Sequence, residues 1–275
     1  MLKLKYFLQE NKMLIVIISI ILICSIAIAI GVYAQITNRG FTGNKNDNET
    51  DTNYEDLKNN FEDIFTNNIN KEATAKLNIN YDELLYCRYN IKEEKSGKYN
   101  IDAKIPEFKG ESEVIQNINK EIYDTFAGEI IKIANTATVY TTYNLDYVAY
   151  VNNSIISLVI MCKYKNGTNP QRRIVQTYNY DIEKDKLLNI EDIINYKNLN
   201  KEEIKKTVQE EIKKVNNQMK NINNQGYNVY LRDEDSEIYK IENTSNFFLG
   251  KNNYLYLVYA YGNNNYTSEM DLVIF

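Results

Sequence analysis

The sequence predicts an α+β protein in which an N-terminal transmembrane helix precedes an ectodomain of antiparallel sheet packed by two long amphipathic helices. Three observations predict it: an uncharged apolar run at residues 13–34, two later segments with apolar residues at three- and four-residue steps, and several segments in which apolar residues alternate. Roughly 220 residues remain after the run and its polar tether, enough for one large domain.

The apolar run defines a membrane span. Met13 to Ala34 read MLIVIISIILICSIAIAIGVYA without a charged residue, and at about 1.5 Å per residue such a helix spans about 33 Å, enough to cross a bilayer core. The preceding tail, residues 1–12, carries Lys3, Lys5 and Lys12. Acidic residues follow the run: Asp47, Glu49, Asp51, Glu55 and Asp56. The positive-inside rule therefore predicts a protein of the cell membrane with a cytoplasmic N-terminus and an extracellular C-terminal domain.

Two other interpretations of the run stay open but fit less well. A cleaved secretory signal has a shorter apolar region and a small residue at the first position of its cleavage site, where this chain has Val32. A lipoprotein signal places a small residue before its cysteine, whereas Cys24 follows Ile23. We expect Cys24 to be an inert packing residue.

Composition excludes several functions. The net charge of −5 and pI of about 5.1, with no basic block, argue against nucleic acid as a partner and favour a neutral or basic one. The sequence has no histidine, which excludes Ser/His/Asp and Cys/His nucleophile pairs and zinc sites with imidazole ligands. We expect no cofactor.

Residues 35–53 are polar and predict a flexible tether, and residues 54–275 form the extracytoplasmic domain. Its first helix runs from Tyr54 to about Asn68 and either packs on the domain or extends the stalk. The apolar residues that predict this helix are Tyr54, Leu57, Phe61, Ile64 and Phe65.

The next segments predict a hairpin, a helix and a meander. Strands at 86–93 and 98–105 flank a Lys-Ser-Gly turn, and Pro106 and Gly110 end the second strand. Ser112 is the expected N-cap of a helix that runs to about Ala134. Its buried face carries Ile115, Ile118, Ile122, Phe126 and Ile130. Strands at 139–151, 155–164 and 173–182 then predict an antiparallel meander.

A second long helix begins after Asn200, with Glu203 at capping-box spacing. Its apolar stripe is Ile204, Val208, Ile212, Val215, Met219 and Ile222. Strands at 254–261 and 267–275, joined across Gly262 and three asparagines, end the chain. Cys87 and Cys162 lie in strand-like stretches. We expect both to be buried free thiols, although a disulfide between them stays an alternative outside the cytoplasm.

Three groups of residues are weak candidates for a site. Asp233, Glu234, Asp235 and Glu237 offer oxygen ligands for Ca²⁺, but they lack the spacing of an EF-hand, and a solvated loop is the favoured interpretation. Glu269 and Asp271 share a strand face at the spacing of a glycosidase carboxylate pair.

The 24 tyrosines are the third group. They suit either a sugar-stacking or protein-binding face or ordinary strand positions.

Three stretches of the chain resemble a known family. YNIDAKIPEFKGESEVIQNINKEI resembles the opening of the extracytoplasmic domain of RsiV-type anti-sigma factors, which also precedes the catalytic domain of some Gram-positive peptidoglycan deacetylases. IISLVIMCKYKNGTNPQRRIVQTYNYDIEKDKLLNIEDII and FFLGKNNYLYLVYAYGNNNYTSEMDLVIF resemble its later half and closing strands. The resemblance covers about residues 80–275. It implies an α+β ectodomain that, in the anti-sigma members, binds lysozyme.

The chain differs from both kinds of protein in the parts that carry out their functions. The tail MLKLKYFLQENK is about three helical turns, too short for an anti-sigma segment, and the histidine ligands of the deacetylases are missing. We therefore expect a single-pass envelope protein that binds or senses a ligand, either lysozyme or peptidoglycan, without catalysis. A carboxylate-based wall enzyme and a scaffold for another envelope protein are the alternatives.

Overall fold

The computed structural model describes residues 54–65 and 83–275. The chain divides into two compact units, Met1–Thr52 and Asn53–Phe275, and all described residues belong to the second. The expected cytoplasmic tail, membrane span and tether lie outside the described residues. Among those that are described, no helix has the length and apolar character needed to cross a membrane.

The larger sheet has six strands in the order β1-β2-β3-β4-β5-β6. They are β1 Leu85–Lys95, β2 Tyr99–Phe108, β3 Thr141–Asn152, β4 Ile155–Asn166, β5 Arg172–Asp181 and β6 Lys186–Leu187. The predicted hairpin is β1–β2, and the predicted antiparallel meander is β3–β4–β5. The sequence therefore predicted these local pairings correctly.

The pairing of β2 with β3 is parallel, which corrects the expectation of a purely antiparallel sheet. Parallel neighbours need a long crossover, and the helical segment between these strands supplies it. Pro106 does not end β2 either. It lies opposite Cys87, beside an irregularity in the pairing between Cys87 and Tyr89, where a residue without an N–H is tolerated.

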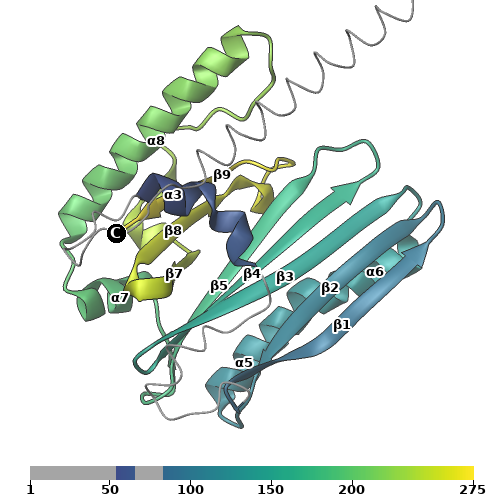
Figure 1. Cartoon of the computed structure of the whole chain (residues 1–275), viewed down its shortest axis with the longest axis horizontal. Helices are drawn as coiled ribbons and strands as arrows, with labels where there is room; N and C mark the ends of the chain where they lie inside the picture. Colours follow the sequence, from purple (N-terminus) through teal and green to yellow (C-terminus); the bar gives the residue numbers. More distant parts are fainter. Residues whose placement is uncertain (1–53, 66–82) are drawn as a thin grey trace, which may run out of the picture. The chain divides into compact units, whose positions relative to one another are not determined.

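The crossover covers one face of the larger sheet (Figure 1) and consists of α5 Glu113–Ile122, the π-helical turn η3 Tyr123–Ala127 and α6 Gly128–Thr136. Ser112 is its N-cap, as predicted, and accepts the N–H of Ile115. The sequence predicts one uninterrupted helix, whereas the structure has a π turn in its middle. The apolar residues from Ile118 to Ile130 recur every fourth residue, a longer spacing than the 3.6 residues of an α-helical turn, and the wider π turn keeps them facing the sheet.

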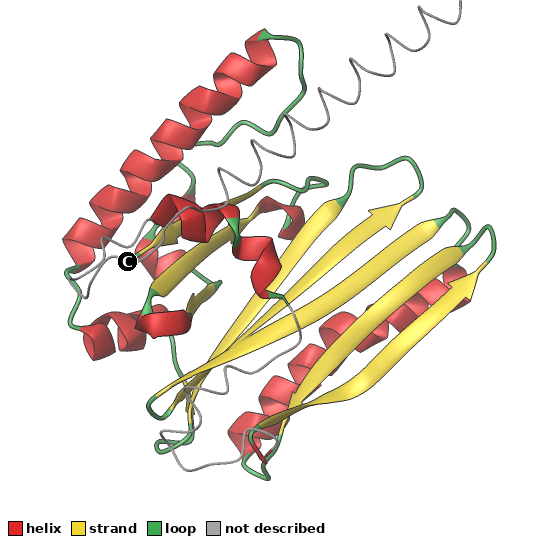
Figure 2. Cartoon of the chain, viewed as in Figure 1, coloured by secondary structure: helices red, strands yellow, loops and turns green. Residues whose placement is uncertain are grey.

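A second, three-stranded sheet contains β7 Phe247–Leu249, β8 Leu255–Ala260 and β9 Met270–Ile274 in the order β7-β8-β9. One face packs on α7 Ile190–Lys197 and α8 Lys201–Asn224, and the other packs on β3, β4 and β5 of the larger sheet. The layers are therefore helix, sheet, sheet and helix (Figure 2). The strand pair predicted at 254–261 and 267–275 is confirmed as β8–β9. The sequence predicts one antiparallel sheet packed by two helices, so the separation of this pair into a second sheet is a correction.

The short helical turns are η1 Phe61–Ile64, η4 Glu237–Tyr239, η5 Ile241–Asn243, η6 Lys251–Asn253 and η7 Tyr261–Asn263. Asn200 caps α8 by accepting the N–H groups of Glu202 and Glu203. The reciprocal capping box occurs one helix earlier, between Asn189 and Asp192.

The first helix packs on the domain, which decides between the two alternatives. It comprises α3 Tyr54–Asn59 followed by η1, and the part of the prediction beyond residue 65 lies outside the described residues. Phe61 is 2% exposed. Lys58 donates to Glu211 of α8 at 2.8 Å, and Lys163 of β4 donates to Glu62 at 2.6 Å.

Cys87 and Cys162 are both free, but they differ in exposure. Cys162 is buried in β4, as expected, whereas Cys87 is exposed in β1, which corrects half of the prediction. Strands β2 and β3 separate them. Three strand spacings of about 4.8 Å place the two cysteines at least roughly 14 Å apart, too far for a disulfide.

Candidate functional site

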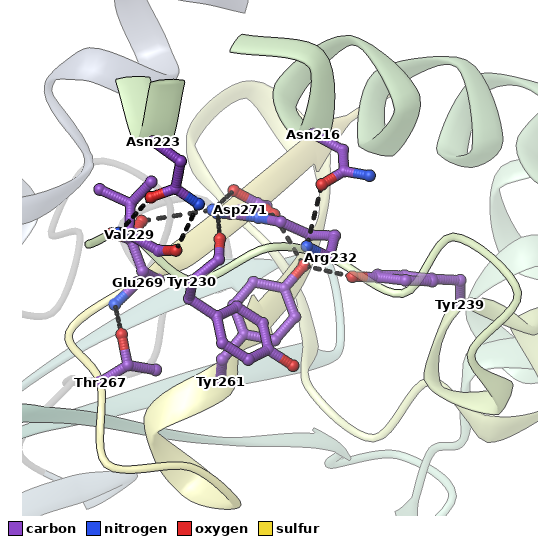
Figure 3. A network of polar contacts seen from close by, with 10 residues as sticks. All are labelled: Asn216, Asn223, Val229, Tyr230, Arg232, Tyr239, Tyr261, Thr267, Glu269 and Asp271. Atoms are coloured by element: carbon purple, nitrogen blue, oxygen red, sulfur yellow. Dashed lines mark hydrogen bonds and ion pairs between the residues drawn. The ribbon is translucent and has the colours of Figure 1, made fainter. Parts of the chain in front are cut away.

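The two carboxylates proposed as a catalytic pair both bind Arg232 (Figure 3). Arg232 Nε donates to Asp271 Oδ2 at 2.8 Å, and Nη2 donates to Asp271 Oδ1 at 2.7 Å. Nη2 also donates to Glu269 Oε2 at 3.3 Å. The exposed fraction is 1% for the Arg232 side chain, 7% for Asp271 and 28% for Glu269. The group at the centre of this arrangement is thus a buried guanidinium.

Arg232 lies in the loop that follows α8 and is held by contacts with that helix and with the loop itself. Its backbone N–H donates to the side chain of Asn216 at 3.0 Å, and its Nη1 donates to the carbonyl of Tyr230. The guanidinium carbon lies 5.2 Å from the ring centre of Tyr261. The Tyr261 hydroxyl donates to Asp271 Oδ2 at 2.7 Å and lies 2.6 Å from the Tyr239 hydroxyl (Figure 3).

The electrostatics of this network fix its charges. Burial lowers the pKa of Arg232, but the hydrogen bond and charge of Asp271 outweigh burial and raise that pKa above its usual value. Burial, followed by the Asp271 charge, raises the pKa of Tyr261 well above its usual value. At neutral pH Arg232 is therefore cationic and Tyr261 is neutral, and both donate hydrogen bonds to Asp271.

This geometry gives Asp271 a structural role. A glycosidase pair needs one carboxyl that holds a proton and another that is free to attack or to activate water. Asp271 instead accepts three hydrogen bonds, two from Arg232 and one from Tyr261. Glu269 is turned toward the same guanidinium. The spacing along the strand predicts a carboxylate pair, but the Arg232 guanidinium bonds to both side chains.

The acidic cluster at residues 233–237 is divided among different partners. Glu234 accepts from Asn216 at 2.6 Å and pairs with Lys220, and Glu237 pairs with Lys240. The Asp233 carboxylate accepts the backbone N–H of Asp235. In the part of the chain that the structure describes, no three acidic or cysteine side chains are grouped so that they could hold a metal ion.

The tyrosines divide between the core and the surface. Those buried in the core are Tyr99, Tyr143, Tyr147, Tyr150, Tyr178, Tyr180, Tyr239, Tyr256, Tyr259 and Tyr261. Tyr227 and Tyr266 are the most exposed of the described tyrosines, at 65% and 64%. Tyr266 differs from Tyr227 because it borders a groove.

We call this depression the Tyr266 groove. Its volume is about 330 Å³, and its polar lining includes Glu129, Lys132, Tyr164, Asn166, Asn169 and Arg172. These residues come from α6, β4, the turn after β4 and the start of β5. The single carboxylate that lines it, Glu129, pairs with Lys132 at 3.1 Å. The sequence does not predict this groove, because its lining comes from segments that are far apart in the chain, from η3 to the turn before β9.

Two further grooves are present among the described residues, one lined by charged residues and one without them. One of about 570 Å³ lies between α3, α8 and β9, and its Lys58, Glu62, Glu211 and Lys214 are engaged in ion pairs. The other, the neutral groove, has a volume of about 260 Å³, and none of its described lining residues is charged. Tyr261 and residues 263–265 border the neutral groove, so a single turn, residues 261–267, adjoins both it and the Tyr266 groove.

Comparisons with known proteins give limited similarity. No protein-family model matches the chain, and no curated protein matches it. One similar solved structure is a DUF3298 family protein from Pseudomonas aeruginosa PAO1, with 14% identity, a TM-score of 0.25, and coverage of 39% of this chain and 53% of that one. Another is a DUF3298 family member from Bacteroides fragilis NCTC 9343, with 11% identity, a TM-score of 0.31, and coverage of 58% and 74%.

The chain spans about half the length of the first of these proteins. Both TM-scores are low, so the similarity establishes neither a shared family nor a shared activity. Both of these structural neighbours of the α+β domain are described as DUF3298 family proteins.

Proposed function

We propose that this chain is a single-pass, membrane-anchored protein whose extracytoplasmic α+β domain binds a ligand of the cell envelope without chemical turnover. The apolar run at residues 13–34 and the charges on either side of it support the anchor and its orientation. The absence of histidine from the sequence supports the non-enzymatic part of the proposal.

One observation carries the binding proposal: the contrast between the Arg232 network and the Tyr266 groove. The network contains the acidic residues that suited catalysis: Asp271 is buried, Glu269 is partly exposed, and both pair with Arg232. The groove is open and lined by aromatic, amide and cationic groups, with one paired carboxylate. Aromatic and amide groups around a concavity suit recognition, whereas carboxylate-based hydrolysis needs a second free acid.

The ligand is either lysozyme or a cell-wall glycan. The net charge of −5 favours association with a cationic protein through electrostatic steering, and the resemblance to RsiV-type domains points to lysozyme. The groove chemistry favours a glycan. A carboxylate-based wall enzyme and a scaffold are the competing functions.

Calorimetric titration of the full-length chain, in a detergent without a sugar head group, tests the binding. Lysozyme and peptide-free wall glycan are titrated separately at two salt concentrations. We expect saturable binding of at least one of them. Lysozyme binding weakens with salt if charge drives it. Absence of heat with both would contradict the proposal and favour the scaffold.

Protease protection tests the anchor. Protease added to intact wall-free cells should remove the chain after Tyr54 and leave the N-terminal tail protected, because the domain lies outside. Protection of the C-terminus would contradict the orientation and with it every ligand considered above.

A further inference from the structure

We propose that the Tyr266 groove is an oligosaccharide-binding site, with Tyr266 as the ring on which a sugar packs. This inference rests on the proposed function and deepens it, since it names the site and the ligand class.

The turn is fixed to the larger sheet by contacts that leave little freedom. A Cβ atom on Gly262 would lie 2.4 Å from the carbonyl oxygen of Arg173 and 2.6 Å from that of Thr267, so backbone packs directly on backbone. The Asn263 side chain pairs with both backbone groups of Val175, at 3.0 and 2.9 Å. Arg172 Nε donates to the Gly262 carbonyl at 2.7 Å. The turn is therefore preorganised, which lowers the entropic cost of binding.

The residues that this anchoring presents to solvent suit a sugar. Asn264, Asn265 and Tyr266 are exposed. The guanidinium of Arg172 lies over the ring of Tyr266, 5.1 Å from the ring centre. This contact supports the ring from one side. A tyrosine ring packs on the C–H face of a sugar, and an amide both donates to and accepts from hydroxyls. An exposed ring on a rigid turn is thus a ready stacking platform.

Ring packing and a hydrogen bond also fix the wall of the groove. Tyr164 of β4 packs edge-to-face on Tyr143 with ring centres 6.0 Å apart. The Tyr143 hydroxyl donates to the carbonyl of Phe126 at 3.4 Å. Phe126 and Thr125 belong to the π turn η3 and line the groove. π turns occur frequently at functional sites, so this departure from α-helix points to the same place as Tyr266.

The size and charge of the groove favour a saccharide over a protein. A volume of about 330 Å³ is within the range of small-ligand sites, about 300 to 1,000 Å³. A stable protein interface needs about 800 Å² from each partner. The groove carries Arg172 and Lys132 against one carboxylate, Glu129, so it does not attract a cationic protein. The adjoining neutral groove, bordered by the same turn, provides uncharged polar groups for further sugar units.

The test is calorimetric titration of the full-length chain, in a detergent without a sugar head group, with a tetramer of β-1,4-linked N-acetylglucosamine and with peptide-free wall glycan. The variants are Tyr266→Ala and Tyr266→Phe. Tyr227→Ala is the matched control, because Tyr227 is 65% exposed and Tyr266 is 64% exposed, while Tyr227 lines none of the three grooves. Circular dichroism checks that each variant folds.

We expect saturable binding of at least one glycan, weakened about tenfold by Tyr266→Ala and changed by less than about twofold by Tyr266→Phe or Tyr227→Ala. Equal affinity of wild type and Tyr266→Ala would overturn this site while leaving the proposed function intact. Binding of lysozyme without binding of either glycan would do the same. Absence of binding to all three would overturn both proposals.

Discussion

Arg232, in the loop after α8, and Asp271, on β9, form a two-point ion pair with N···O distances of 2.8 and 2.7 Å. They are 39 residues apart in sequence. The pair joins the loop that leaves the long helix to the last strand of the chain. Two parallel N–H···O bonds fix both distance and orientation, so this contact specifies how the C-terminal third of the domain closes.

Breaking this pair should destabilise the domain strongly. Asp271→Asn leaves a buried guanidinium without its counter-charge, and we expect a loss of about 3–5 kcal/mol in the free energy of unfolding. Urea unfolding of residues 53–275 measures it. The control is Lys206→Ala, because the Lys206–Glu210 pair is exposed, and its loss should be about 0.5 kcal/mol or less.

A double variant tests whether the loss of stability comes from the unpaired charge of Arg232. Arg232→Met combined with Asp271→Leu removes both charges, and we expect it to be more stable than Asp271→Asn alone. If Asp271→Asn costs no more than the Lys206 control, the guanidinium is solvated in solution and the structural role assigned to Asp271 is wrong.

Two glycines should respond in opposite directions to alanine. Gly262→Ala places a methyl group within 2.4 to 2.6 Å of backbone atoms, so the turn must move, and we expect a loss of about 1–3 kcal/mol. Gly128→Ala lies in α6, where the nearest atom is 3.9 Å away, and the better helix propensity of alanine should add up to about 1 kcal/mol. Urea unfolding of both variants checks this. Equal effects would show that the turn is not fixed as described.

Stability should decrease in acid partly through Glu62. The hydrogen bond from Lys163 holds the pKa of Glu62 below its ordinary value of 4.5, although partial burial acts in the opposite direction. A carboxylate with a lowered folded-state pKa stabilises the fold above its unfolded-state pKa and loses that effect as pH falls through the folded-state value. We therefore expect the stability difference between wild type and Glu62→Gln to be largest above pH 4.5 and to shrink below it.

Unfolding free energy measured against pH for both proteins tests this. Because the sequence has no histidine, the curve should also be nearly flat between about pH 6 and 8. A constant difference between the two proteins down to the acid limit would show that Glu62 has no lowered pKa.

The cysteines should react at different rates. Cys87 is exposed and Cys162 is buried in β4, where burial raises the pKa of its thiol well above the usual value. In a Cys24→Ser background, a thiol reagent should modify Cys87 in the native protein and Cys162 after unfolding. Mass spectrometry counts the labels. Two labels in native protein would contradict the position of Cys162.

The periodic elements of this fold were predictable from sequence because their signals are local. The stripe from Ile204 to Ile212 predicts α8, and the alternation from Thr141 to Val151 predicts β3. The strand pair at 254–261 and 267–275 was also predicted, and it is β8–β9. Its separation into a second sheet with β7 was not predictable, because β7 has three residues and strand partners are chosen by tertiary packing. The parallel β2–β3 pair likewise depends on where the crossover helix packs.

The sites were harder to predict for a related reason. Glu269 and Asp271 were found by spacing, but Arg232 occurs in the charged stretch LRDEDSE, which is typical of a solvated loop. Its burial depends on Asp271, 39 residues away. Tyr266 follows an asparagine-rich turn, a signal for exposure. The groove beside it needs α6, β4 and β5 to converge, and no local pattern predicts that.

Binding without turnover is the central claim, and mass analysis of a ligand after binding tests it most directly. The full-length chain is incubated with peptide-free wall glycan and, separately, with lysozyme, and each ligand is then recovered and weighed by mass spectrometry. The account predicts that both ligands return unchanged in mass. Shortened or modified glycan whose amount grows with protein concentration, and which disappears in Glu269→Gln, would contradict it and identify the domain as an enzyme.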